Sequence, residues 1–247
     1  MAPVMLNQLA RYSAVVPLVE ECSGETLLEV GSGSEGIARF ADGRWAVTVC
    51  DRDFTDYGSL AEVPEDGLRR VQGDVTKLPF ADREFDVVVA LDLLEHLPAE
   101  LRPVALIELA RVSRFRLIAG CPCGDRALAA DRSLARYYAV QPRATPPWLV
   151  EHLENGFPDA DLLTHSLTPF GAVRLVPNDR VGAHLAVSLL EGTPYVARLA
   201  LRLARRLEPG IERPGGTSSP SARRWINALR GGDREPAYRQ IAVLDRG

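Results

Sequence analysis

The stretch 27–40, LLEVGSGSEGIARF, constrains the fold of this chain more than any other. A short apolar run comes first, glycines follow at Gly31, Gly33 and Gly36, and apolar residues at helical spacing come next. Glycine allows the positive φ angles of a tight turn and lets a ligand approach the backbone closely. The pattern therefore predicts a strand, a tight turn and the start of a helix, with a ligand bound against the turn.

Further apolar segments predict strands that alternate with helices. The run 85–90, FDVVVA, is typical of a strand buried on both faces of a parallel sheet. We expect an α/β fold, with a doubly wound, Rossmann-like sheet that is mostly parallel, an antiparallel last strand and helical elaborations between the late strands. The expected strands are 27–30, 45–50, 68–72, 85–90, 115–119, 160–165, 172–176 and 238–244, and the expected helices are 5–21, 35–42, 53–62, 99–112, 124–141, 148–154, two within 181–207, and 221–230.

Acidic residues surround the predicted turn and end two of the predicted strands. The glycine spacing, with Asp51 twenty residues after Gly31, fits the dinucleotide fingerprint of nicotinamide oxidoreductases. Glu29 and Glu35 would repel a pyrophosphate at this helix start, so they favour a cationic ligand without phosphate. S-adenosylmethionine is such a ligand: Asp51 could accept its ribose hydroxyls and Asp74 its adenine amino group. The simpler interpretation is that these acids cap helices.

Three segments in order resemble the class I S-adenosylmethionine-dependent methyltransferases: LLEVGSGSEG, VTVCDRDF and VQGDVTKLPFADREFDVVVALDLLEHLP. The similarity is strongest to the small-molecule branch with an FD…EHL signature at the fourth strand, and it covers about residues 25–120. It implies S-adenosylmethionine as cofactor. The implied contacts are Glu29, Gly31, Ser32 and Gly33 at the methionine part, Asp51 and Arg52 at the ribose, Asp74 and Val75 at the adenine, and Leu91 and Asp92 beside the sulfonium.

The resemblance also implies a domain organisation. We expect residues 1–247 to form a single methyltransferase domain whose cofactor-binding half is 1–120. Residues 121–170 would line the acceptor pocket, and a helical insertion at 179–235, with a mobile loop at 209–220, would precede the last strand. The segment that begins CPCGDRALAADRSLARYYAV resembles methyltransferases encoded among cell-surface glycan genes. The expected acceptor is therefore a small molecule or a glycan.

One residue departs from the family pattern. Glu35 stands where the family has a glycine, and Gly36 comes one place later. A glutamate in this turn could narrow the cofactor pocket. The competing hypothesis is therefore a non-catalytic binding or scaffold protein on a degenerate methyltransferase fold.

Methyl transfer from a sulfonium is an in-line displacement, so positioning the acceptor can supply much of the acceleration. A base is needed only if the acceptor must lose a proton. His96, in DLLEHLP, is the candidate base, and its alternative role is to fix the turn to Pro98. His152, His165 and His184 fit structural roles better, although His152 could line an acceptor pocket.

No metal site is expected. Cys121 and Cys123 could form half of one, but neither a second pair nor a suitable histidine lies nearby in the sequence. Four cysteines at this length form no disulfide framework, which predicts a reduced, cytoplasmic protein. The N-terminal segment lacks a basic region before its apolar part, so it fits an amphipathic helix better than a signal peptide.

The segment Tyr195–Arg206 places arginines on one helical face and apolar residues on the other. Such a helix could pack on the sheet with a solvated arginine face, or it could make weak peripheral contact with an anionic membrane. No nucleic-acid partner is expected, because residues 1–192 carry 28 acidic and only 18 basic side chains. The sequence leaves the oligomeric state open.

Overall fold

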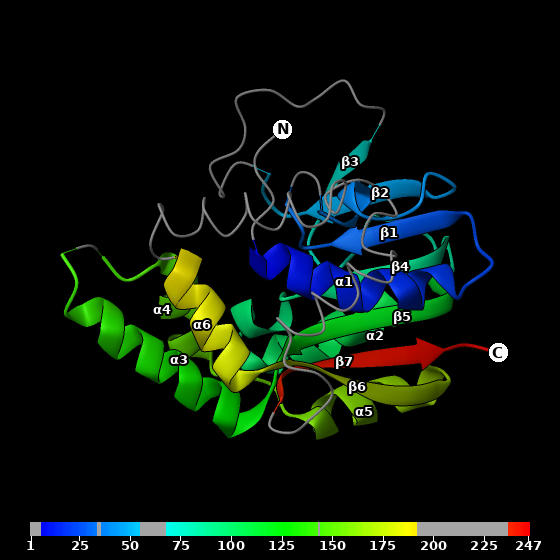
Figure 1. The fold of residues 1–247 in the computed structure, drawn as a ribbon. Coiled ribbons are helices and arrows are strands. Elements are labelled where there is room, and N and C mark those ends of the chain that lie inside the picture. The colour runs from blue at the N-terminus through cyan, green and yellow to red at the C-terminus, as the bar shows by residue number, and fades with distance from the viewer. Residues whose placement is uncertain (1–5, 34–35, 55–67, 143, 192–236) are drawn as a thin grey trace.

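The computed structural model describes residues 6–33, 36–54, 68–142, 144–191 and 237–247 (Figure 1). Within these residues, seven strands form one sheet in the order β3-β2-β1-β4-β5-β7-β6. The strands are β1 Thr26–Val30, β2 Ala46–Asp51, β3 Arg69–Gln72, β4 Phe85–Leu91, β5 Ser113–Pro122, β6 Ala172–Arg180 and β7 Ala237–Asp245.

Among the seven described strands, β7 runs opposite to the other six. It pairs antiparallel with both β5 and β6, whereas the pairs from β3 to β5 are all parallel. The expected fold class is confirmed, including the antiparallel last strand. Because β1 lies between β2 and β4, the strand order reverses there, and ligands of α/β sheets bind at the carboxyl ends of strands at such a point.

Helices cover both faces of the sheet. One apolar core packs α1 and α6 against the sheet, and the other packs α2 and α5 against the opposite face. Helices α3 and α4 lie beyond the carboxyl ends of the parallel strands (Figure 1). The helices are α1 Leu6–Glu20, α2 Arg102–Val112, α3 Gly124–Ala139, α4 Pro147–Asn155, α5 Ala160–Leu167 and α6 Val181–Glu191, and the short 3-10 turns are η1 Gly36–Arg39, η2 Leu94–His96, η3 Ala99–Leu101 and η4 Thr168–Phe170.

The prediction of a strand at 160–165 is wrong, because this segment forms α5. The Asp159 carboxylate accepts a hydrogen bond of 2.7 Å from the backbone N–H of Leu162 and so caps the helix. Leu163 and Leu167, one helical turn apart, are both fully buried. A short apolar run does not by itself distinguish a strand from a helix, and here the cap and the four-residue spacing decide.

The predicted helix at 35–42 is only the single 3-10 turn η1. Several other expected elements lie outside the described residues: the helix at 53–62 beyond its first two residues, the second helix within 181–207, the loop at 209–220 and the helix at 221–230. The basic segment Tyr195–Arg206 lies outside them too. In the part of the chain that the structure describes, no helix combines the length and apolarity needed to cross a membrane.

Burial in the second core gives a stability prediction. Leu106 of α2 is fully buried, whereas its neighbour Ile107 is 45% exposed. Leu106→Ala should lower the free energy of unfolding by about 2–5 kcal/mol, because it removes buried apolar atoms and leaves a cavity. Ile107→Ala, the matched control, should change it by about 0.5 kcal/mol or less. Urea unfolding measures both, and equal losses for the two variants would contradict this packing.

Candidate active site

The strand ends bring the predicted cofactor residues to one edge of the sheet. Val30 at the end of β1 is paired with Cys50 on one side and Ala90 on the other, and Asp51 is paired with Gln72 of β3. The acids that follow these strands therefore lie along a common edge, beside the glycine turn. This edge is the candidate active site.

All three described glycines of the turn adopt positive φ angles, +80° at Gly31, +70° at Gly33 and +50° at Gly36. A Cβ atom at Gly36 would collide with the Glu29 carboxylate, and one at Gly31 would lie 2.8 Å from Leu93. A Cβ atom at Gly33 would meet no described atom within 4 Å, so the backbone there is open to a ligand. Glu35 lies outside the described residues, and the glycine that contacts Glu29 is Gly36.

The Glu29 carboxylate lies fully buried beneath the turn. It accepts hydrogen bonds from the backbone N–H of Ile37 and, at 2.8 Å, from the Tyr12 hydroxyl of α1. Burial raises the pKa of Glu29 to about 7, although these hydrogen bonds favour the charged form. Glu29 thus holds the turn from below and ties it to the leading helix.

Asp51 holds the same turn from the side. Its Oδ2 atom accepts a hydrogen bond of 2.9 Å from the backbone N–H of Gly33, and Oδ1 accepts one of 3.3 Å from Asp53. Of the other residues predicted to contact the ribose and the adenine, Arg52 and Asp74 are exposed and Val75 is buried. Hydrogen bonds from Thr76 to the Asp74 carboxylate lower the pKa of Asp74. Asp74 is therefore a charged acceptor at the surface of this edge.

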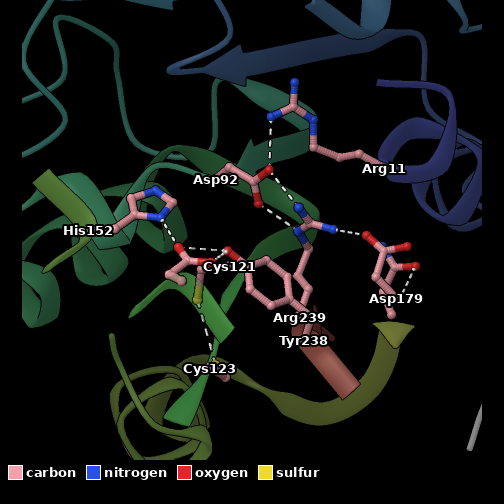
Figure 2. Close-up of polar contacts among 10 residues, drawn as sticks. Arg11, Asp92, Cys121, Cys123, His152, Asp179, Tyr238 and Arg239 are labelled. Carbon is pink, nitrogen blue, oxygen red and sulfur yellow. Dashed lines mark hydrogen bonds and ion pairs between the residues drawn. The ribbon is translucent and has the colours of Figure 1, made fainter. Parts of the chain in front are cut away.

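Asp92, just after β4, lies in a buried ion-pair network (Figure 2). Arg239 of β7 donates to both carboxylate oxygens at 2.6 and 2.7 Å, and Arg11 of α1 donates at 3.0 Å. Arg239 also pairs with Asp179 at the end of β6. Burial opposes ionisation of Asp92, but the two guanidinium groups hold its pKa well below the ordinary value. Leu91, the residue before it, is buried.

The candidate base His96 belongs to η2, which follows the same strand. Its Nδ1 atom lies 2.5 Å from a carboxylate oxygen of Glu151, in α4. Burial lowers the pKa of His96 below its ordinary value, and Glu151 opposes this only in part. The imidazole is therefore neutral at neutral pH, with Nδ1 held by Glu151.

A second carboxylate, Asp131 of α3, lies at the centre of a buried hydrogen-bond cluster. Its carboxylate is hydrogen-bonded to His152 Nδ1 at 2.7 Å and to the Tyr238 hydroxyl at 3.0 Å (Figure 2). It also lies 3.2 Å from His184 Nε2. The His184 ring stacks on Tyr238 with ring centroids 3.5 Å apart. Helices α3, α4 and α6 are thereby joined to the start of β7, next to Arg239.

Sequence reasoning missed several members of these networks: Arg11, Tyr12, Glu95, Asp131 and Arg239. Glu95 is fully buried, and neither of its carboxylate oxygens has a hydrogen-bond partner among the described residues. Burial raises its pKa well above the ordinary value. Its position beside His96 in DLLEHLP was a signal that could have been used. The others lie far along the chain from their partners, so no local pattern marks them.

The raised pKa of Glu29 predicts a pH dependence of stability. Because the folded state binds this proton more tightly than the unfolded chain, whose carboxyl titrates near 4.5, the stabilisation is complete below pH 4.5 and is lost as the pH rises through about 7. It amounts to about 3 kcal/mol. Glu29→Gln should remove this contribution to the change of the free energy of unfolding with pH. Urea unfolding measured from pH 4.5 to 8 tests this. An unchanged dependence on pH would contradict the assignment.

The network around Arg239 gives a second stability prediction. Arg239→Met should lower the free energy of unfolding by about 3–5 kcal/mol, because it leaves the carboxylates of Asp92 and Asp179 buried with too few positive partners. Arg174→Met on the neighbouring strand β6 is the control, since that side chain is 45% exposed and its ion pair with Glu21 lies at the surface. It should cost about 0.5 kcal/mol or less. Thermal or urea unfolding that ranks the two variants equally would contradict the prediction.

Comparison with known proteins agrees with this geometry. Residues 28–115 match the family model described as a methyltransferase domain. A search of curated protein sequences finds no match. Among solved structures, the chain is similar to phosphoethanolamine N-methyltransferase 2 from Haemonchus contortus, in complex with S-adenosyl-L-methionine, at 12% identity and a TM-score of 0.54, over 95% of this chain and 52% of that one.

It is similar in fold to two further proteins. One is a possible histamine N-methyltransferase from Thermotoga maritima, at 12% identity and a TM-score of 0.52, over 97% of this chain and 91% of that one. The other is the YcgJ protein from Bacillus subtilis, at 14% identity and a TM-score of 0.50, over 96% of this chain and 98% of that one. Residues 28–115 therefore carry a methyltransferase domain, and the described fold is shared with these solved structures.

Proposed function

We propose that this enzyme transfers the methyl group of S-adenosylmethionine to a small-molecule or glycan acceptor. The observation that carries the proposal is the row of acids at the carboxyl ends of adjacent strands, beside a glycine turn with one open face. This edge offers hydrogen-bond acceptors and negative charge. A cofactor with a sulfonium, an ammonium group and ribose hydroxyls, but no phosphate, is complementary to it.

In this proposal the cofactor lies along the edge from β3 to β4. Asp74 and Val75 would contact the adenine, Asp51 and Arg52 the ribose, and Gly31, Ser32 and Gly33 the methionine part. Glu29 would act from beneath, since its carboxylate is already engaged by Ile37 and Tyr12. Leu91 and Asp92 would border the sulfonium, and the Asp92 carboxylate is held in place there by Arg11 and Arg239.

His96 is the proposed base for an acceptor that must lose a proton. Its imidazole is neutral, its Nδ1 atom is held by Glu151, and Nε2 makes no hydrogen bond to any described residue. A neutral imidazole with one free nitrogen can accept a proton. An acceptor held against α3 and α4, within the segment 121–170, would reach it.

The remaining proposals concern surroundings and partners. All four cysteines are free thiols, which supports a cytoplasmic, reducing location. The acidic excess of residues 1–192 supports an acceptor other than nucleic acid. Weak peripheral membrane contact through Tyr195–Arg206 stays a prediction, and sedimentation with anionic liposomes at low salt tests it.

The cofactor geometry predicts the effect of one substitution. Asp51→Ala should weaken binding of S-adenosylhomocysteine at least tenfold, about 1.4 kcal/mol, because it removes the proposed ribose acceptor and the side chain that holds Gly33. Asp161→Ala, an exposed aspartate on α5, is the matched control and should bind like the wild type. Isothermal titration calorimetry measures all three proteins. Equal affinity of the Asp51 variant and the wild type would contradict the assignment.

The acceptor class needs a separate measurement. The wild type and S-adenosylmethionine are incubated with fractions of a cell extract, and the S-adenosylhomocysteine formed is quantified. Turnover on the small-molecule or glycan fraction would support the proposal. Turnover confined to the protein or nucleic-acid fractions would contradict it.

A further inference from the structure

The tripeptide Glu-His-Leu occurs twice, at 95–97 in and after η2 and at 151–153 in α4, and the fold places the two copies against each other. His96 of the first copy contacts Glu151 of the second, 55 residues away, at 2.5 Å. The rings of His96 and His152 have centroids 5.0 Å apart. Two imidazoles and two carboxylates therefore meet at one place, beyond the carboxyl end of β4.

Glu95 is the unusual member of this group. Its side chain is fully buried, and within the described residues neither oxygen accepts a hydrogen bond. A buried carboxyl group without a hydrogen-bond partner lowers the stability of the folded state. Such groups in native proteins call for a specific explanation, such as a bound ion. One ligand atom of Glu95 lies within 4.8 Å of one from His96 and one from His152.

Each histidine has a carboxylate on one ring nitrogen, as metal-ligating histidines commonly do. Nδ1 of His96 is held by Glu151. Nδ1 of His152 is held by Asp131 at 2.7 Å (Figure 2). No described residue makes a hydrogen bond to Nε2 of either ring, so Nε2 is the atom left for a metal. A carboxylate on the far nitrogen fixes the tautomer and raises the basicity of the ligating one. The rings of Trp148 and Phe157 pack on His152 and provide an apolar surrounding.

The backbone that carries these ligands is fixed before any ligand binds. The buried guanidinium of Arg102 donates to the carbonyls of Leu94 and Leu97 on one side. On the other side it donates to the carbonyls of Asn155 and Gly156, at 2.8 and 2.7 Å. The Asn155 amide also donates to the His96 carbonyl at 3.2 Å. Arg102 and Asn155 thus fasten η2 to the end of α4, as a preorganised site requires.

We propose that Glu95, His96 and His152 bind one divalent first-row transition-metal ion, such as zinc. The metal would keep one coordination position open. Two imidazoles and a carboxylate suit such ions, whereas Mg²⁺ and Ca²⁺ prefer all-oxygen sites. Ligand atoms around zinc lie about 3.4 Å apart, so ligand atoms that lie within 4.8 Å of one another would have to approach by about 1.4 Å at most. No metal site was expected from the sequence, because the two segments that carry these histidines lie far apart in the chain and no local pattern joins them.

The open position would give the metal a role in the reaction. A metal there could hold an oxygen or nitrogen of the acceptor and lower its pKa, and so take over the proton-removing task proposed for His96. This consequence rests on the proposed function, whereas metal binding itself does not. The test therefore measures binding with neither cofactor nor acceptor present.

The experiment titrates the EDTA-treated full chain with Zn²⁺ by calorimetry and with Co²⁺ by visible absorption. The wild type should bind one equivalent, and Co²⁺ should give the spectrum of a nitrogen and oxygen site. Glu95→Gln, which keeps the size of the side chain, should weaken binding at least tenfold. His165→Gln, an exposed histidine on α5, is the matched control and should bind like the wild type. His96→Gln is the second ligand variant, used if Glu95→Gln does not fold.

Two results would overturn the proposal. One is the absence of binding by the wild type, or equal binding by the wild type and the ligand variants. The other is binding that is lost in Cys123→Ser but kept in Glu95→Gln, because the metal would then be held by the thiols of Cys121 and Cys123, whose sulfur atoms lie 3.8 Å apart. Failure of metal binding would leave the cofactor site and the proposed base His96 untouched.

Discussion

The buried guanidinium of Arg239 is the interaction on which the candidate site depends. It joins the end of β4, through Asp92, to the end of β6, through Asp179, and Arg11 of α1 completes the charge balance at Asp92. The direction of β7 makes this contact available. Because β7 runs antiparallel to the other described strands, its first residues lie at the carboxyl ends of the parallel strands, and Arg239 reaches the candidate active site from there.

The same end of β7 also anchors the hydrogen-bond cluster around Asp131. Tyr238, next to Arg239, donates its hydroxyl to Asp131, and Asp131 orients His152. One strand terminus therefore supports two networks, an ionic one at the candidate active site and a hydrogen-bonded one behind the histidines (Figure 2). Both are buried, so each polar group needs its partner, and a change in one strand would disturb both sides of the site.

The glycine turn is held by two carboxylate side chains, and its backbone stays open on one face. Glu29 holds it from below, Asp51 holds it from the side, and Gly33 leaves its outer face open. The glycine at 36, one place later than in the family pattern, is the one whose missing side chain makes room for Glu29. The turn is thus built around a buried carboxylate.

Local patterns in the sequence were sufficient for the glycine turn, for β4 and for the acids at the strand ends, because each depends on neighbours within a few residues. They were insufficient for α5, where a short apolar run fits a strand or a helix until the Asp159 cap and packing decide. They could not place Glu95 against His152, or Arg239 against Asp92, since these pairs form only when distant segments fold together. The sequence by itself determined the fold class and the row of acids at the strand ends. Tertiary structure alone decided how the buried charges are paired and which histidines meet, because burial makes those long-range contacts necessary.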